Sequence, residues 1–213
     1  MISGNRLRRR NAALIPALLC AAMLFVAPAC ADNAAVHPGS DLQQIMLDLQ
    51  SVKQSQAKFT ERKYLSMLNQ PLESSGTLVY VAPDHLEKNT EQPKPESLVV
   101  DGDNLVVTGG DGGQSRSLSL ADNPQIGAIV ESIRATLAGD SDGLERFYTV
   151  SLLGGVPAWT LVLEPRDPKV QAMVQSIRIS GHNGRIETIE TLETGGDRSV
   201  MTVLPMTAPA GSP

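Results

Sequence analysis

Cysteine is nearly absent from this chain. Its 213 residues contain only Cys20 and Cys30, and both lie close to the N-terminus. The rest of the chain has no thiol for a disulfide or a zinc site, and the histidines His37, His85 and His182 are far apart in sequence. We therefore expect a domain that is stabilised by its hydrophobic core alone and that holds no metal or other cofactor.

Positive charge is also scarce. The chain has 18 lysines and arginines against 23 aspartates and glutamates, which gives a formal net charge of −5. Four of the arginines lie between Arg6 and Arg10, so the chain without that segment would be more acidic still. This charge argues against nucleic acid or an anionic membrane surface as a partner.

The first 31 residues have the pattern of a secretory signal peptide. The basic segment is followed by an apolar run from Ala12 to Val26 and then by the small-x-small sequence Ala29-Cys30-Ala31. The apolar run is shorter than the roughly 20 residues that a membrane-spanning helix needs, which disfavours an uncleaved anchor. Acylation of Cys30 is a second alternative, although Ala27 stands where a lipoprotein signal normally has a large aliphatic residue.

We predict cleavage after Ala31 and a location in the periplasm. The remaining chain is long enough for one domain. We expect a flexible leader at 32–39, a single domain at 40–205 and a C-terminal tail at 206–213.

Apolar periodicity predicts two amphipathic helices. The first should follow Ser40 as N-cap, with Leu42, Ile45, Met46, Leu49 and Val52 on one side. The second is the best-defined element, with Asp122 or Asn123 as cap, Pro124 in the first turn and Gly139 as its stop. Its apolar stripe consists of Ile126, Ile129, Val130, Ile133 and Leu137.

About ten short strands are predicted, with turns rich in Asn, Asp, Gly and Pro between them. They lie near 57–66, 76–82, 97–101, 104–108, 115–120, 146–153, 157–164, 175–181, 184–193 and 198–204, with a short helical turn after Asp167. This spacing favours an α+β fold with one large curved antiparallel sheet. We expect an incompletely closed β-barrel with the helices over its mouth as a lid.

No catalytic constellation is evident. Gly139 to Gly143 match the G-x-S-x-G pattern around Ser141, but a helix is predicted before this segment where a serine hydrolase has a strand. An esterase that uses Ser141 is therefore the weakest alternative. Asp140 to Gly143 lack the later ligands of a calcium loop, and the glycine-rich segment 108–115 lacks the Lys-Ser/Thr of a phosphate loop. We expect the protein not to be an enzyme.

The order of several short motifs resembles the LolA-type periplasmic lipoprotein carriers. After the first helix come Phe59-Thr60-Glu61, Gly76-Thr77-Leu78, the hairpin segment 101–105 and, near the end, the turn 196–199. The likeness extends over most of 40–204. It implies an open β-barrel with a helical lid that carries acyl chains of lipoproteins, as a monomer, from an inner-membrane donor to an outer-membrane acceptor.

The chain also departs from that family. Ala82 stands where the carriers have arginine before the proline, and Leu86 and Lys88 replace aromatic residues. We therefore interpret the chain as a divergent LolA-like protein whose cargo is a lipoprotein or another lipid-linked product. A lipid-sensing interaction module on the same fold is the alternative.

The resemblance and the apolar patterns together indicate which residues would line the cavity and its lid. The strand at 76–82 is apolar on both faces, as a wall between a cavity and other packed groups would be. An ordinary buried core remains the alternative for these side chains. The predicted lining residues are Phe59, Leu78, Tyr80, Leu86, Leu98, Val100, Leu105, Ile126, Ile129, Ile133, Leu137, Trp159 and Leu161.

Overall fold

The computed structural model describes residues 38–109 and 113–206. The predicted signal peptide, most of the predicted leader and all but Met206 of the predicted tail lie outside the described residues. The helices are α1 (Pro38–Gln50), α2 (Pro124–Ala138), α3 (Ser141–Phe147) and α4 (Pro168–Gln171). The strands are β1 (Gln54–Tyr64), β2 (Leu72–Val81), β3 (His85–Gln92), β4 (Glu96–Asp101), β5 (Asn104–Gly109), β6 (Ser115–Ser119), β7 (Tyr148–Gly155), β8 (Ala158–Pro165), β9 (Val174–His182), β10 (Arg185–Glu193) and β11 (Arg198–Pro205).

All eleven strands belong to one antiparallel sheet with the order β6-β5-β4-β3-β2-β1-β11-β10-β9-β8-β7. Strands β6 and β7 form its two edges and do not pair, so the sheet stays open. The first and last strands, β1 and β11, pair in its middle. This confirms the predicted α+β class with a large, incompletely closed antiparallel sheet.

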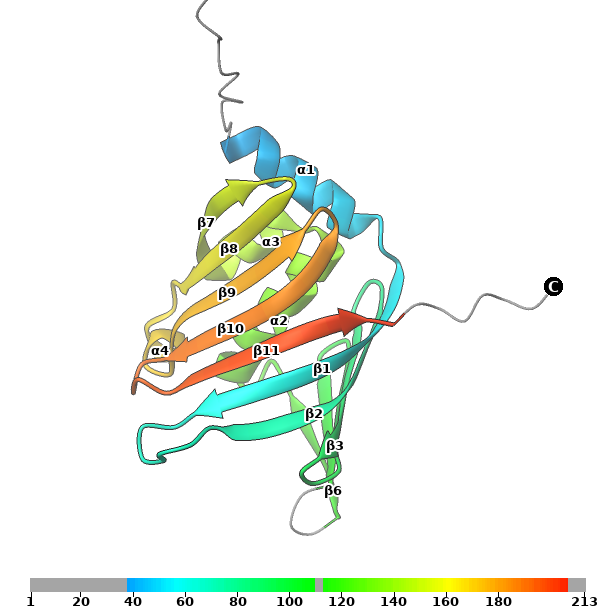
Figure 1. The fold of residues 1–213 in the computed structure, drawn as a ribbon, viewed down its shortest axis with the longest axis vertical. Coiled ribbons are helices and arrows are strands. Elements are labelled where there is room, and N and C mark those ends of the chain that lie inside the picture. The colour runs from blue at the N-terminus through cyan, green and yellow to red at the C-terminus, as the bar shows by residue number, and fades with distance from the viewer. Residues whose placement is uncertain (1–37, 110–112, 207–213) are drawn as a thin grey trace, which may run out of the picture. The chain divides into compact units, whose positions relative to one another are not determined.

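Three helices pack on the half of the sheet that contains β7 to β10. Figure 1 shows α2 and α3 behind β8, β9 and β10, with α1 crossing the upper end of the sheet. Their apolar side chains meet those of the strands in a set that we call the first apolar cluster. Its buried members are Ile45, Met46, Leu49, Ala135, Leu144, Tyr148, Trp159, Leu161, Leu163, Val174, Ile177 and Ile179.

The ends of α2 follow the sequence prediction. Asn123 is the N-cap, Pro124 starts the helix, and Gly139 is the C-cap with φ of 65°, a left-handed conformation that glycine adopts easily. A Cβ on Gly139 would also overlap the carbonyl oxygen of Met46 in α1. The glycine therefore both ends α2 and allows α1 to approach it.

Three local predictions were wrong or incomplete. Helix α1 begins at Pro38 and contains Ser40, because proline fits the first turn of a helix, where its missing N–H is not needed. Strand β3 was not predicted because His85–Gln92 is mostly polar, and its structure depends on pairing with β2 and β4. Helix α3 was not predicted, and the strand that was expected from 146 begins only at Tyr148; the Asp140 side chain caps α3 by accepting from the Gly143 N–H at 2.9 Å.

Candidate functional site

One face of the sheet is covered by the helices, and pairing register shows which residues share it. Side chains alternate along each strand, so residues that are paired across strands lie on the same face. Phe59 pairs with Gly76 and Val203, and Ala57 pairs with Leu78. We call the helix-covered face that carries these residues the inner face. Along β1 it runs from Lys63 through Glu61, Phe59 and Ala57 to Ser55, and along β2 it runs from Leu72 to Tyr80 in steps of two.

The inner face of the other half of the sheet carries a second apolar cluster. Its buried members are Val100, Leu105 and Leu120. Partly buried side chains from β3 to β6 and from α2 pack against them, namely Leu86, Leu98, Val107, Leu118, Ile126 and Val130. Helix α2 thus contacts both halves of the sheet and is the element that joins the two clusters.

Helix α2 buries its small side chains and leaves its large aliphatic ones partly exposed. The residues that are buried on this helix are Ala128, Ser132, Ala135 and Thr136. Ser132 and Thr136 are 0% exposed, and both satisfy their hydroxyls on carbonyl oxygens of the same helix. Ile133 and Leu137, by contrast, are only half-buried and belong to neither apolar cluster. Helical spacing places them on the same side as Ile126 and Val130.

The predicted lining residues are therefore divided between different surroundings. Trp159, Leu161 and, at its edge, Ile129 belong to the first cluster. Val100 and Leu105 belong to the second cluster, against which Leu86, Leu98 and Ile126 pack. Phe59 and Tyr80 are buried outside both clusters, whereas Leu78, Ile133 and Leu137 are half-buried outside both. These side chains therefore do not form one cluster among the described residues, and their role in lining a ligand site remains a proposal.

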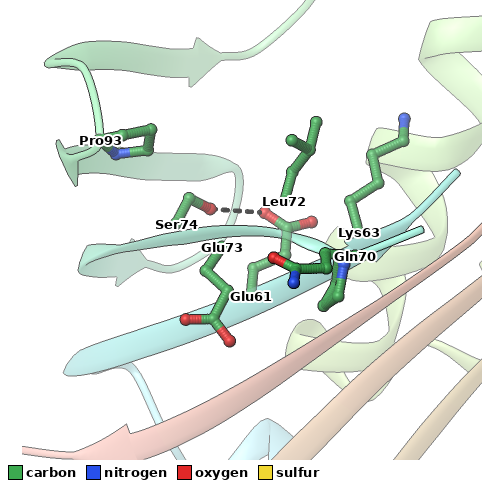
Figure 2. A pocket seen from close by; sticks show the side chains of 8 residues that line it. Glu61, Lys63, Gln70, Leu72, Glu73, Ser74 and Pro93 are labelled. Carbon is green, nitrogen blue, oxygen red and sulfur yellow. Dashed lines mark hydrogen bonds between the residues drawn. The ribbon is translucent and has the colours of Figure 1, made fainter. Parts of the chain in front are cut away.

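A hollow of about 730 Å³ lies at the end of the inner face that is near the β1–β2 loop. Figure 2 shows Lys63, Leu72 and Ser74 around it, with Glu61 beside Ser74. Gln70, Pro71, Glu73 and Pro93 complete its lining. The hollow is thus lined by polar, charged and apolar groups, and it adjoins the inner-face row that leads along β1 and β2 to Phe59 and Tyr80.

A partly buried ion pair separates this hollow from the apolar part of the inner face. Lys88 Nζ donates to Glu61 Oε2 at 2.6 Å and lies 5.1 Å from the centre of the Phe59 ring. Ser74 also donates to Glu61 Oε2, at 3.5 Å. Lys88 was noticed in the sequence only as a departure from an aromatic position. Its pairing with Glu61 could not be inferred from the sequence, because the two residues are 27 positions apart.

Arg134 of α2 reaches the turns of two hairpins. Its Nη1 donates to the carbonyl oxygen of Gly102 at 3.0 Å, in the β4–β5 turn, and its Nη2 lies 3.8 Å from Asp84 Oδ2, in the β2–β3 turn. Glu131 Oε2 is also 3.8 Å from Nη1. Sequence reasoning missed this residue. One sequence feature could have identified it. Arg134 is a charged residue next to the aliphatic stripe of a helix that was predicted to be a lid.

The G-x-S-x-G segment does not have the surroundings of a hydrolase nucleophile. Helix α3 does follow Ser141, but helix α2 and not a strand precedes it. Ser141 lines a smaller hollow of about 390 Å³ together with residues of α1, Gly139 and Glu145, and this lining contains no histidine. His85 and His182 instead contact glutamates, Glu87 at 2.9 Å and Glu187 at 2.8 Å.

Comparison with known proteins identifies the family. A family model described as outer membrane lipoprotein carrier protein LolA-like matches residues 33–211. The chain belongs to this LolA-like family. No curated protein sequence matches the chain at a significant level.

Within residues 38–109 and 113–206, no helix is long and apolar enough to cross a membrane. The same residues include no group of three or more His, Cys, Asp or Glu that could hold a metal ion.

Several solved structures are similar to this LolA-like protein. A LolA superfamily protein from Nitrosomonas europaea has 13% identity and a TM-score of 0.40, over 79% of this chain and 95% of that one. A putative outer membrane lipoprotein-sorting protein domain from Vibrio parahaemolyticus has 9% identity and a TM-score of 0.44, over 80% and 94%. MucB from the Pseudomonas aeruginosa MucA/MucB complex has 18% identity and a TM-score of 0.42, over 80% of this chain and 59% of that one.

Proposed function

We propose that this protein is a periplasmic carrier that binds acyl chains and delivers them towards the outer membrane without covalent chemistry. The cargo would be a lipoprotein or another lipid-linked product. Membership of a family described as outer membrane lipoprotein carrier protein LolA-like supports this class of ligand. The role requires a donor at the inner membrane and an acceptor at the outer membrane.

The incompletely buried aliphatic side of α2 carries the proposal. Helices that only complete a core bury their large apolar side chains and expose the polar ones. Helix α2 departs from this pattern, because it buries Ser132 and Thr136 completely and leaves Ile133 and Leu137 only partly buried. An acyl chain placed between this side of α2 and strands β2 to β5 would cover the exposed aliphatic groups.

The expected affinity follows from apolar burial. Each methylene group removed from water contributes about 0.8 kcal/mol, so ten of them contribute roughly 8 kcal/mol before the costs of association. Useful binding therefore needs few polar contacts. A carrier must also release its cargo, and a surface that binds through apolar area alone allows this.

The test is lipid retention and transfer by the chain without its predicted signal peptide. The protein would be purified from the periplasm in the absence of detergent, and native mass spectrometry with lipid extraction would identify what is bound. We expect acyl lipids to co-purify and to exchange with vesicles. A protein that never retains or exchanges acyl lipids would not be a carrier, and one stable protein partner without exchange would indicate the sensing role instead.

A further inference from the structure

Two buried polar atoms beside α2 lack a partner within the protein. Among the buried side-chain nitrogen and oxygen atoms of the described residues, only Tyr80 Oη and Arg134 Nε have none. Tyr80 is 3% exposed, and the Arg134 side chain is 20% exposed. Buried polar groups are nearly always hydrogen-bonded, because a group taken out of water without a new partner destabilises the fold. These two atoms are therefore the places in this region where a ligand group would find free hydrogen-bond donors.

Both residues border the second apolar cluster. Tyr80 lies on the inner face directly opposite Leu86, which packs against that cluster. Arg134 follows Val130 by one helical turn, and Val130 packs against the same cluster. The Arg134 side chain also reaches the end of the strand that carries Tyr80, because its Nη2 lies 3.8 Å from Asp84 Oδ2 in the β2–β3 turn.

The chemistry of the two groups defines what they would bind. Arg134 Nε can only donate a hydrogen bond. Burial raises the pKa of Tyr80, so its phenol keeps its proton at neutral pH and can donate as well. Arg134 forms ion pairs at 3.8 Å with Asp84 and Glu131 through its two Nη atoms, so Nε is the donor that is left for a ligand oxygen.

We infer that Tyr80 Oη and Arg134 Nε form a binding site for the anionic oxygen head of an acyl ligand whose chain packs against the second apolar cluster. This inference rests on the proposed function and narrows its ligand to acyl lipids that carry a free carboxylate or phosphate. A charge-assisted hydrogen bond from each group would fix the end of the chain, while the apolar surface would tolerate different chain lengths.

The test compares ligands that differ only in their head group. Binding of myristate, tetradecyl phosphate and methyl myristate would be measured by displacement of an uncharged apolar dye. We expect the two anionic ligands to bind at least about tenfold more tightly than the ester, because hydrogen bonds to charged groups are the strong ones. Tyr80→Phe and Arg134→Gln should each remove most of that preference, measured as the ratio of the affinity for each anionic ligand to the affinity for methyl myristate.

Stability gives a second measurement for the same variants. Because the Tyr80 hydroxyl has no partner in the protein, Tyr80→Phe should not lower the thermal midpoint. Tyr64→Phe and Arg146→Gln are the controls, since Tyr64 is partly exposed beside Arg198 and Arg146 lies on α3. Both controls should keep the full preference for anionic ligands.

The outcomes separate this inference from the proposed function. If neither the dye nor any acyl ligand binds, the carrier proposal fails. If all three ligands bind equally well, or if the preference for anions survives in both Tyr80→Phe and Arg134→Gln, the head-group site is wrong and the carrier proposal stands.

Discussion

Tyr148 Oη donates a 2.8 Å hydrogen bond to the carbonyl oxygen of Ala128. This bond joins the first residue of β7 to the middle of α2, and Tyr148 is 0% exposed. Because Ala128 lies on the small-residue side of α2, the bond helps to hold that side against the first apolar cluster. The aliphatic side of the helix is thereby directed towards the other half of the sheet.

The first prediction concerns this bond. Tyr148→Phe removes the donor and should reduce the free energy of unfolding by about 1 kcal/mol, which corresponds to a lower thermal midpoint by roughly 2–4 °C. The change in the thermal midpoint would be measured by thermal unfolding at pH 7, followed by circular dichroism. Tyr64→Phe is the control, because that side chain is partly exposed, and it should leave the midpoint unchanged.

Alkaline titration gives the same bond a pH signature. Burial raises the pKa of Tyr148 from its ordinary value of 10.0 to about 12. Because the folded state favours the protonated phenol, its contribution is fully present below pH 10.0 and is lost as the pH rises through about 12. Wild-type stability should fall over this range, and it should fall less steeply in Tyr148→Phe. Equal slopes would contradict the assignment.

The second prediction concerns the Glu61–Lys88 pair. Both side chains are less than one third exposed, so removing one partner leaves a poorly solvated charge. We expect Lys88→Met alone to lower the free energy of unfolding by about 1–2 kcal/mol, and the double variant Glu61→Gln/Lys88→Met to recover at least half of that loss. Chemical denaturation of the four proteins completes the double-mutant cycle.

A matched exposed pair is available as the control for that cycle. Arg62 of β1 and Glu73 of β2 form a 3.0 Å contact, but their side chains are 63% and 65% exposed. The cycle of Arg62→Gln and Glu73→Gln should show a coupling energy below about 1 kcal/mol. If both cycles gave the same coupling, burial of the Glu61–Lys88 pair would have no energetic importance.

Local pattern was sufficient for much of the fold but not for the contacts that join distant segments. Ten of the eleven strands and helix α2 were predicted because they combine apolar periodicity with Gly, Asn or Pro at their ends. Polar β3 has no such pattern. Its Lys88 faces inward, opposite Leu78, and pairs there with Glu61 of β1. Such pairing depends on the register of the sheet, which the sequence alone does not define.

The candidate site was predictable to a similar degree. The apolar stripe of α2 was recognised, but the sequence did not show which side of the helix is more deeply buried. Burial of Ser132 and Thr136 depends on their hydrogen bonds to carbonyl oxygens of their own helix. From the sequence, the large aliphatic residues of the stripe fitted a lid and an ordinary core equally well. The half-buried state of Ile133 and Leu137 was therefore visible only once α1, α3 and the sheet were in place.

The third prediction asks whether the aliphatic side of α2 serves ligand or core. Ile133 is half-buried and belongs to neither apolar cluster, so a carboxylate there can reach water. Ile133→Glu should therefore lower the free energy of unfolding by only about 1–2 kcal/mol. The same charge would face the acyl chain in the proposed complex, and lipid retention should be lost.

A core position on the first cluster provides the contrast. Ile179 is 0% exposed, and Ile179→Glu should lose several kcal/mol because the carboxylate would be buried without a partner. Both variants would be assayed for thermal unfolding and for retained acyl lipid by native mass spectrometry. An Ile133→Glu protein that unfolds as readily as Ile179→Glu would show that this side of α2 is ordinary core. A folded Ile133→Glu protein that still retains lipid would place the ligand elsewhere on the molecule, because a carboxylate within the apolar contact would have to be desolvated by the bound chain.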